Sequence, residues 1–383
     1  MNSPGGMDAQ VAVIGGGVVG CAVAHALAER GVETALFEAE AELGLGASGT
    51  NSGILHTGFD SPPGELETTL ILRSAELRDE LIERLGIPAI PCGAELRPSD
   101  EREAGAVERI VEAAGTNGVG VTLRSDGVLE VPGEAVTDPV AFTLGLAAAA
   151  QAGGAEVRTH AAVEAIEPAA DRLTISAGGG DRGDFVFAVN SAGLRADEVA
   201  RMAGDASFEI YPRKGEFFVF DPPGGEPLER ILLPVPTGRT KGVLVFPTID
   251  GKVVAGPTAH DQLDKDDWSV RAEAAEEVLP KARAMLPALA GQEPIAGYVG
   301  LRPAGREANY LIGASRSCPR LINAAAIRST GLTASLGIAE HVVGLLSEAG
   351  LKLGPRRRLA PASDPPRGDS PWWLRTAREK VGA

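Results

Sequence analysis

Two short apolar runs near the N-terminus flank a segment of small residues. Residues 11–14 (VAVI) and 32–37 (VETALF) are short and rich in β-branched or apolar side chains, which is typical of strands buried in a parallel sheet. The small residues that follow Gly20 predict a helix to about Arg30, and Gly31 ends it. A strand, a helix and a strand within about 30 residues predict a βαβ unit.

Farther along the chain, helical and strand periods alternate. Polar and apolar residues at helical spacing predict helices over 66–85, 94–117, 270–286 and 331–348. Thr137-Asp138-Pro139 predicts another helix start, because proline fits the first turn, and this helix runs to about Gln151. Short apolar runs predict strands over 156–159, 172–177, 185–190, 310–313 and 320–325.

Two stretches depart from this alternation. Residues 215–258 hold the runs GEFFVF, GVLVFP and KVVAG, separated by Gly/Pro turns, and this pattern predicts antiparallel strands. Residues 44–64 are rich in Gly, Ser and Asn and show no periodicity, and loops of that length are usually functional.

Composition and charge narrow the class of protein. A chain of 383 residues predicts two domains or one elaborated domain, and 44% hydrophobic with 23% charged residues excludes global disorder. The 36 basic and 52 acidic residues give a net charge of −16, which argues against a nucleic-acid partner because phosphate contacts need a basic surface. An anionic substrate would therefore need Lys or Arg side chains held locally in its site.

Cysteine usage and hydropathy predict neither a metal site nor a membrane span. Cys21, Cys92 and Cys318 are far apart and odd in number, so no disulfide framework or metal-ligand spacing follows, and a reducing cytoplasm is the natural location. Residues 11–28 carry no formal charge, but their glycines split the run into a strand, a turn and a helix.

The segment from Gly15 to Gly20 matches the G-x-G-x-x-G fingerprint of dinucleotide binding. Its glycines permit a tight turn, close approach of a pyrophosphate, and packing of the helix on the strand. Glu38 follows the second strand, where a carboxylate binds a ribose hydroxyl. The second match, residues 178–183, lies between two strand-like runs and predicts only a hairpin turn. One fingerprint near the N-terminus, followed by a long loop, favours tightly held FAD.

Residues 47–60 (ASGTNSGILHTGFD) resemble the flavin-contact loop of the D-amino-acid-oxidase-type superfamily, particularly its glycerol-3-phosphate oxidase/dehydrogenase branch. The same branch is resembled by YPRKGEFFVF, GVLVFPTIDGKVVAGPTAHDQLDKDD, GLRP and IRSTGLTAS, at residues 211–220, 242–267, 300–303 and 327–335. The related L-2-hydroxyglutarate oxidases share the loop and the first of these blocks, so they remain competitors.

The resemblance implies an α/β fold with an α+β second domain. A discontinuous Rossmann-like FAD-binding domain would comprise residues 8–78, 138–204 and 308–352. An antiparallel-sheet substrate domain would comprise residues 79–137 and 205–307, and residues 353–383 would form a basic tail. The active site would then lie between the two domains.

The resemblance also implies which residues contact FAD. The start of the last helix, at 330–333, would place its positive end against the N1–C2=O edge of reduced flavin. The implied contacts are Gly15, Gly17, Val18, Val19, Gly20, Glu38, Ala39, Ser48, Asn51, Ser52, Gly53, Ile54, Val163, Ala192, Gly193, Gly300, Thr330, Gly331, Leu332 and Thr333.

Oxidation of a secondary alcohol removes a hydride, which flavin N5 accepts, and a proton, which a base accepts. The resemblance places His56 at the family's active-site histidine, and imidazole can accept a proton near neutral pH. The other histidines lie on predicted helices, at a strand end or in a loop. We therefore expect His56 to be the catalytic base.

An anionic substrate needs cations within reach. The resemblance matches Arg302, Lys265 and Ser329 to substrate-contact positions. Arg302, expected in a turn after a strand, offers a fork that fits phosphate or carboxylate, Lys265 offers a point charge, and Ser329 offers a hydroxyl donor. Without the resemblance, Lys265 in QLDKDD would be interpreted as a solvated loop charge.

The resulting hypothesis is FAD-dependent oxidation of sn-glycerol 3-phosphate to dihydroxyacetone phosphate, with oxygen or a quinone as acceptor. Glu67-Thr68-Thr69 and residues 304–309 (AGREAN) depart from the family pattern near the expected substrate entrance. These departures leave open an L-2-hydroxy-acid oxidase of the L-2-hydroxyglutarate type and a glycine-oxidase-like amine oxidase. A flavin-carrying subunit that needs a partner chain is a further alternative.

Beyond Gly354 the composition becomes basic, and the segment holds Trp372 and Trp373. The first interpretation is a tail that packs over its own domain or is partly disordered. The second is a surface anchor toward a membrane or a redox partner.

Overall fold

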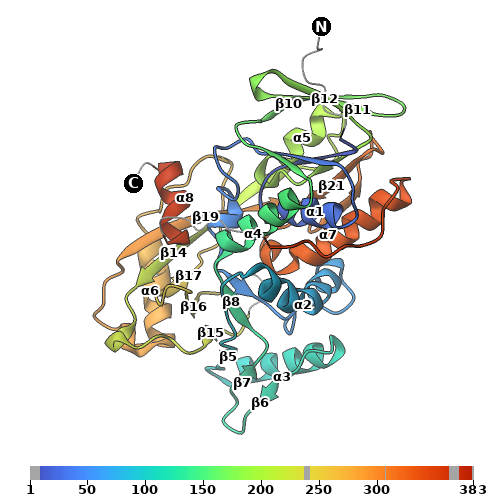
Figure 1. Ribbon diagram of the computed structural model, residues 1–383. Coiled ribbons are helices and arrows are strands. Elements are labelled where there is room, and N and C mark those ends of the chain that lie inside the picture. Colours follow the sequence, from blue (N-terminus) through green and yellow to red (C-terminus); the bar gives the residue numbers. More distant parts are fainter. Residues whose placement is uncertain (1–8, 237–241, 307, 362–370, 382–383) are drawn as a thin grey trace.

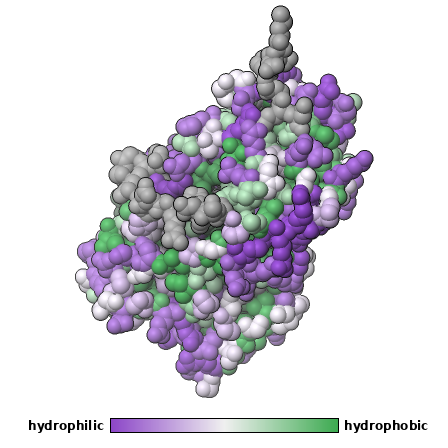
Figure 2. All heavy atoms as spheres, in the orientation of Figure 1, coloured by the Kyte–Doolittle hydropathy of each residue, from purple (hydrophilic) through white to green (hydrophobic). Residues whose placement is uncertain are grey.

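The computed structural model describes residues 9–236, 242–306, 308–361 and 371–381. Most of its strands belong to two main sheets, which lie on opposite sides of the molecule (Figure 1). The first sheet contains β21 and lies next to α1 and α7, and the second sheet contains β14, β16 and β17 (Figure 1). The face shown in Figure 2 is largely hydrophilic, with apolar residues scattered among the polar ones.

The first sheet has six strands in the order β20-β21-β13-β1-β2-β9, all parallel except β20. The four residues of β1 are fully or almost fully buried, as the continuous apolar run predicts for a central strand. The strands are β1 (Val11–Ile14), β2 (Thr34–Phe37), β9 (Glu156–Arg158), β13 (Phe187–Asn190), β20 (Leu311–Ala314) and β21 (Leu321–Ala325).

Both faces of this sheet are covered. Val11 and Val13 pack in one core with the helices, whereas Ala12 and Ile14 pack in another with a three-stranded sheet. The helices are α1 (Val18–Glu29), α2 (Leu66–Leu85), α4 (Pro139–Ala152) and α7 (Gly331–Glu348). The small sheet consists of β10 (Val163–Pro168), β11 (Leu173–Ala177) and β12 (Asp181–Phe185), and α5 (Ala196–Met202) packs beside β10.

The second sheet has nine strands and is mostly antiparallel. Its longest strands, β14 (Ile210–Phe220) and β19 (Ala296–Gly305), pair from Ile210↔Gly305 to Val219↔Ala296. The others are β5 (Ala94–Leu96), β6 (Thr122–Leu123), β7 (Leu129–Val131), β15 (Ile231–Leu233), β16 (Leu244–Pro247), β17 (Val253–Gly256) and β18 (His260–Asp261).

Further elements complete the fold. A small sheet in the order β3-β8-β4 is formed by β3 (Ile54–Leu55), β8 (Ala135–Thr137) and β4 (Ala89–Ile90). The remaining helices are α3 (Glu101–Thr116), α6 (Ala274–Met285) and α8 (Trp372–Val381). Short 3-10 turns are η1 (Ala47–Gly49), η2 (Gly178–Gly180), η3 (Gly193–Arg195), η4 (Pro223–Gly225) and η5 (Pro287–Leu289).

The predicted α/β class with an antiparallel second sheet is confirmed. The strands of the first sheet come from three separate parts of the chain, so the unit that they form is discontinuous. The distribution of strands between the two sheets supports the proposed FAD-binding domain, with residues 8–78, 138–204 and 308–352, and the proposed substrate domain, with residues 79–137 and 205–307. The residue boundaries of that division remain our proposal.

Two predicted helices begin later than expected. Residues 94–96, predicted as helix, form β5, which pairs with β7 and β15. The helix instead starts at Glu101, because the Asp100 side chain accepts the Glu103 amide and caps it. The helix expected from residue 270 begins at Ala274.

Other local predictions hold. The predicted helix over 331–348 is α7, although it is not the last helix, because α8 follows it in the tail. The second glycine cluster forms the turn between β11 and β12. The uncharged run 11–28 divides into β1, a turn and α1. No helix in the described parts of the chain is both long and apolar enough to cross a membrane.

Candidate active site

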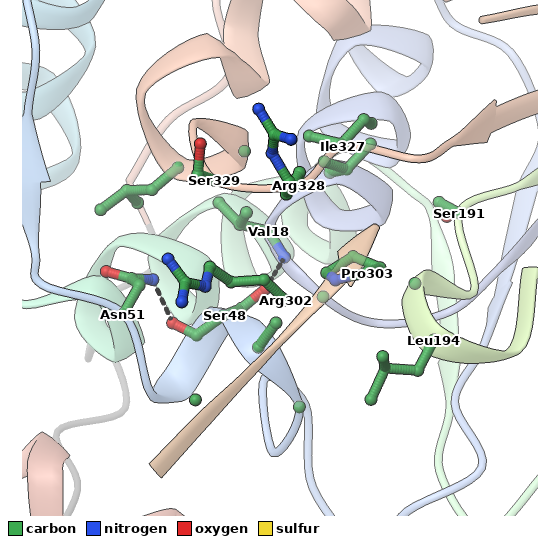
Figure 3. Close-up of a pocket in the computed structure, with 18 of the residues that line it drawn as sticks. Val18, Ser48, Asn51, Ser191, Leu194, Arg302, Pro303, Ile327, Arg328 and Ser329 are labelled. Carbon is green, nitrogen blue, oxygen red and sulfur yellow. Dashed lines mark hydrogen bonds between the residues drawn. The ribbon is translucent and has the colours of Figure 1, made fainter. Parts of the chain in front are cut away.

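A cavity of about 790 Å³ lies between the two main sheets and is lined by residues from both. Figure 3 shows Arg328 and Ser329 in the upper part of the view, and Arg302 below them next to Ser48. All four residues predicted for substrate and catalysis line the cavity, namely His56, Arg302, Lys265 and Ser329. Every predicted FAD contact except Gly20 and Gly53 lines it as well.

Gly20 and Gly53 are required for close packing behind the wall. A Cβ on Gly20 would lie 1.9 Å from the Gly15 carbonyl oxygen, so glycine lets α1 pack against the turn. Gly53 has a φ of +69°, and a Cβ there would lie 2.4 Å from the Thr137 carbonyl oxygen. These glycines shape the cavity without lining it.

The turn between β1 and α1 fits a pyrophosphate. Gly15 has a φ of +105°, and a Cβ there would lie 2.5 Å from the Ser191 carbonyl oxygen. Gly17 is the N-cap of α1 and has no side chain, so the positive end of the helix faces the cavity. The Val18 amide donates to Ser48 Oγ at 2.9 Å, which ties the long loop to this turn (Figure 3).

Glu38 lies at the end of β2, where a ribose is expected. Its carboxylate accepts the Gly16 amide at 2.7 Å and the Glu40 amide at 2.9 Å, so the side chain is fixed at the cavity wall. Burial raises the pKa of Glu38. The geometry fits an acceptor for ribose hydroxyl groups.

At the other end of the cavity, the N-terminus of α7 points its first turn at the cavity. Thr330 is the N-cap, and its side chain does not cap the amides of the first turn, which belong to Gly331, Leu332 and Thr333. This end of the helix therefore offers donors and a positive dipole to an electron-rich ring edge.

His56 follows β3 and faces this end of the cavity. Its Nδ1 lies 2.8 Å from Oε2 of Glu134, whose side chain is fully buried. Its backbone amide donates to Thr333 Oγ1 at 3.1 Å, which connects the residue to α7. The ring is therefore held through Nδ1 and the backbone through its amide, while 15% of the side chain stays exposed.

Arg302 lies within β19, opposite Arg213 of β14, and not in a turn as predicted. The glycines and Pro303 of β19 interrupt the alternation of apolar and polar residues, so the sequence pattern did not predict this strand. The guanidinium donates to three backbone carbonyl oxygens, those of Arg213 at 3.1 Å, Lys214 at 3.1 Å and Thr258 at 2.7 Å. No described carboxylate forms an ion pair with it.

The charge of Arg302 is therefore unmatched in the cavity. Burial, together with the positive charges of Arg213 and Arg328, lowers the pKa of Arg302 to about 10, although Asp261 opposes this effect. Arg213 itself pairs with Asp261 through two hydrogen bonds, of 2.6 and 2.9 Å. A bound anion would relieve the cost of holding an unpaired, half-buried cation.

Lys265 lines the cavity but already has two acidic partners. Its Nζ donates to Asp197 at 2.7 Å and to Glu198 at 2.9 Å, both on α5. A substrate anion would have to displace or share these carboxylates. A role for Lys265 in substrate binding stays a prediction.

The chain matches the DAO family of FAD-dependent oxidoreductases over residues 10–345. It belongs to that family. Its fold resembles the FAD-bound, dithionite-reduced L-α-glycerophosphate oxidase of Mycoplasma pneumoniae, with a TM-score of 0.85 and 26% identity over 92% of this chain and 97% of that one. The glycine oxidase of Geobacillus kaustophilus shares the fold, with a TM-score of 0.78 at 24% identity over 89% of this chain and 95% of that one.

Curated relatives extend this comparison. Glycerol 3-phosphate dehydrogenase of Caloramator mitchellensis is 28% identical, covering 92% of this chain and 76% of that protein. Glycerol 3-phosphate oxidase of Mycoplasma pneumoniae is also 28% identical, covering 88% of this chain and 94% of that protein. L-2-hydroxyglutarate dehydrogenase of Salmonella houtenae is 27% identical over a shorter part, 68% of this chain and 66% of that protein.

This oxidoreductase is thus FAD-dependent, and the predicted family and cofactor are confirmed. The glycine turn fits the pyrophosphate, Glu38 fits a ribose, and the α7 N-terminus fits the flavin ring. The roles of the individual residues remain our proposals.

The two departures from the family pattern meet at the cavity of this oxidoreductase. Glu67 lies on α2, and its carboxylate accepts hydrogen bonds of 2.6 Å from Asn309 Nδ2 and Thr330 Oγ1. All three residues line the cavity. The departures at residues 67–69 and 304–309 are therefore in direct contact, because Asn309 of the second stretch donates a hydrogen bond to Glu67 of the first.

Sequence reasoning missed Glu134, Arg213 and Arg328. Glu134 is 78 positions from His56 and belongs to no local motif, so no sequence signal connects them. Arg213 and Arg328 lie inside two of the quoted family blocks, and Arg328 directly precedes the predicted substrate residue Ser329. Membership in those blocks was the available signal.

Proposed function

We propose that this oxidoreductase oxidises sn-glycerol 3-phosphate to dihydroxyacetone phosphate. The observation that carries the proposal is the half-buried guanidinium of Arg302, which forms no ion pair with a described carboxylate and shares one cavity with His56. The relatives named as glycerol 3-phosphate oxidase and dehydrogenase support this substrate.

The proposed chemistry divides the two hydrogens of the substrate carbinol between two acceptors. When bound, FAD supplies the hydride acceptor at flavin N5. His56 accepts the hydroxyl proton at Nε2, since its Nδ1 is engaged by Glu134. Arg302 binds the phosphate with Ser329 as a further donor, and Lys265 contributes only where its bonds to Asp197 and Glu198 open.

A second candidate is oxidation of an L-2-hydroxy acid, with the substrate carboxylate at Arg302. The observation that favours it is Glu67, whose carboxylate lines the cavity and would repel a dianionic phosphate group more than a single carboxylate group. The L-2-hydroxyglutarate dehydrogenases among the relatives support the same candidate. The amine-oxidase alternative rests on likeness of fold alone.

We propose oxygen or a quinone as the electron acceptor and the cytoplasm as the location. The relative named as an oxidase supports oxygen. Oxygen consumption and reduction of a soluble quinone analogue, measured with the same substrate, distinguish the two acceptors.

The substrate proposal is tested by anaerobic spectroscopy of the purified protein. Glycerol 3-phosphate, L-2-hydroxyglutarate and glycine are added in separate cuvettes, and the flavin absorption near ~450 nm is followed. We expect rapid bleaching by glycerol 3-phosphate. Bleaching by the hydroxy acid alone would contradict glycerol 3-phosphate as the substrate and support the second candidate. Bleaching by glycine alone would reject alcohol oxidation.

The same experiment tests whether this chain needs a partner. A flavin-carrying subunit that acts only with another chain would not be reduced by substrate when purified alone. Bleaching of the single chain rejects that alternative.

A further inference from the structure

We propose that Glu134 is a positioning residue that selects the tautomer of His56. In this arrangement Nδ1 carries the ring proton, and Nε2 is left as a proton acceptor. The proposal rests on the proposed role of His56 as the base, and it assigns a partner that no local motif contains.

The carboxylate of Glu134 has only acceptor atoms, and both of its oxygens have partners. Oε2 lies 2.8 Å from His56 Nδ1, while Oε1 accepts the Thr57 amide at 2.7 Å and the Thr57 hydroxyl at 2.9 Å. The residue is fully buried, so water does not compete for these contacts. Because a carboxylate accepts and does not donate, Nδ1 is the donor in this pair, and the neutral ring has no proton on Nε2.

Arg78 fixes the backbone on both sides of this pair. Its Nη1 donates to the carbonyl oxygens of Leu55 at 3.0 Å and His56 at 2.9 Å, and its Nη2 donates to the Gly133 carbonyl oxygen at 2.7 Å. The segments that carry the imidazole and the carboxylate are therefore joined through one buried guanidinium from α2. The ring can be set in place before a substrate binds.

A glutamine at position 134 would reverse the tautomer without changing the shape. The Thr57 amide can only donate, so the glutamine carbonyl oxygen must take the Oε1 position. The amide NH₂ group would then face Nδ1, which must accept, and the ring proton would move to Nε2. A ring protonated at Nε2 cannot take the substrate proton, as when the triad aspartate of a serine protease is replaced by asparagine.

The test compares Glu134→Gln with the wild type in three measurements. Bound flavin reports folding, ¹⁵N NMR of histidine-labelled protein reports the tautomer, and anaerobic flavin reduction reports the chemical step. His56→Asn identifies the His56 signals by their loss. We expect full flavin content, the proton on Nε2, a limiting reduction rate at least ~100-fold lower, and a half-saturating substrate concentration within about threefold of the wild type.

Two further variants separate positioning from packing. Glu134→Asp keeps a carboxylate, so it should restore the Nδ1 proton and a reduction rate at least ~10-fold above that of Glu134→Gln. Thr57→Val removes one donor to Oε1 and leaves the bond to His56, so its rate should stay within about threefold of the wild type.

The proposal is overturned if Glu134→Gln retains the proton on Nδ1, or if its flavin is reduced at the wild-type rate. Equal losses in Glu134→Gln and Glu134→Asp would also overturn it, because packing alone would explain them. If no tested substrate reduces the wild-type flavin, the proposed function fails, and the NMR result still decides the role of Glu134.

Discussion

Arg302 and His56 are the two residues on which the chemistry depends, and each is held by hydrogen bonds to residues from elsewhere in the chain. The guanidinium of Arg302 binds three carbonyl oxygens, and the backbone of His56 is tied to Arg78 and Thr333. Neither residue needs a substrate to define its position. Such preorganisation lets binding energy act on the reaction rather than on ordering side chains.

Replacing Arg302 by methionine removes the unmatched cation and keeps much of the volume. We expect KM for the anionic substrate to rise at least ~10-fold, since a charge-assisted hydrogen bond contributes about 1.5–3 kcal/mol. Steady-state kinetics measure the effect. Arg306→Met is the control, because Arg306 pairs with Glu209 outside the cavity and its loss should leave KM unchanged.

The lowered pKa of Arg302 predicts a pH limit for substrate binding. The side chain is cationic below its pKa of about 10 and becomes neutral as the pH rises through that value. KM for the anionic substrate should therefore stay level from about pH 7 to 9 and rise toward pH 10 and above. A KM that is unchanged up to pH 10.5, or that rises equally in Arg302→Met, contradicts this assignment.

At the scale of elements, α8 accounts for the tryptophan-containing part of the tail. Trp372 and Trp373 are buried, and Trp372 packs edge-on against Tyr298 of β19 at 5.4 Å. The indole of Trp373 donates to Asp250 at 3.1 Å. Arg375 binds the Leu43 carbonyl oxygen at 3.1 Å, so the helix braces the loop that forms one wall of the cavity. Figure 1 shows α8 beside β19.

This packing supports the interpretation of the tail as a cover for its own domain. Trp372→Ala should lower the free energy of unfolding by about 3 kcal/mol, because a buried aromatic side chain is lost. Denaturant unfolding of the holoprotein measures the change, with Arg358→Ala, an exposed residue, as the control. An effect below about 0.5 kcal/mol would show that α8 is not packed as described.

Membrane anchoring would require both indoles to leave these contacts. Binding to anionic vesicles, compared between the full chain and a variant that ends at residue 354, tests the anchor. Equal binding would eliminate it, whereas loss of binding on truncation would establish it.

Local patterns predicted the elements that depend on neighbouring residues. The βαβ unit and α7 each lie in one continuous stretch of sequence with a clear apolar pattern, so their approximate bounds were predictable. β19 was not, since its glycines and Pro303 break the pattern and its partner strand lies about eighty residues earlier. Glu134 and His56 are likewise brought together only by tertiary packing, which no local rule encodes.

At the scale of the whole molecule, an acidic chain encloses a cavity whose wall carries both signs of charge. The net charge is −16, and carboxylates such as Glu38 and Glu67 line the cavity together with Arg302 and Arg328. Arg302 forms no ion pair with a described carboxylate, so it is a local cation that an anionic ligand can reach in spite of the overall charge. Since the cavity walls come from both main sheets, a ligand that fills it also joins the two halves of the fold.

Removal of FAD should lower the thermal unfolding temperature, because a ligand that binds only the folded state stabilises it by mass action. The apoprotein, prepared by mild denaturant and gel filtration, is compared with protein reconstituted with FAD. We expect reconstitution to restore the holoprotein value. An unchanged unfolding temperature in protein that rebinds FAD would contradict a cofactor held between the two sheets.

The central claim is that His56 accepts the substrate proton next to the flavin. Its most direct test is the limiting rate of anaerobic flavin reduction by glycerol 3-phosphate in the wild type and in His56→Asn, each with bound FAD. We predict rapid reduction in the wild type and a rate at least ~100-fold lower in the variant, with a similar half-saturating concentration. Reduction of His56→Asn at the wild-type rate would contradict the claim.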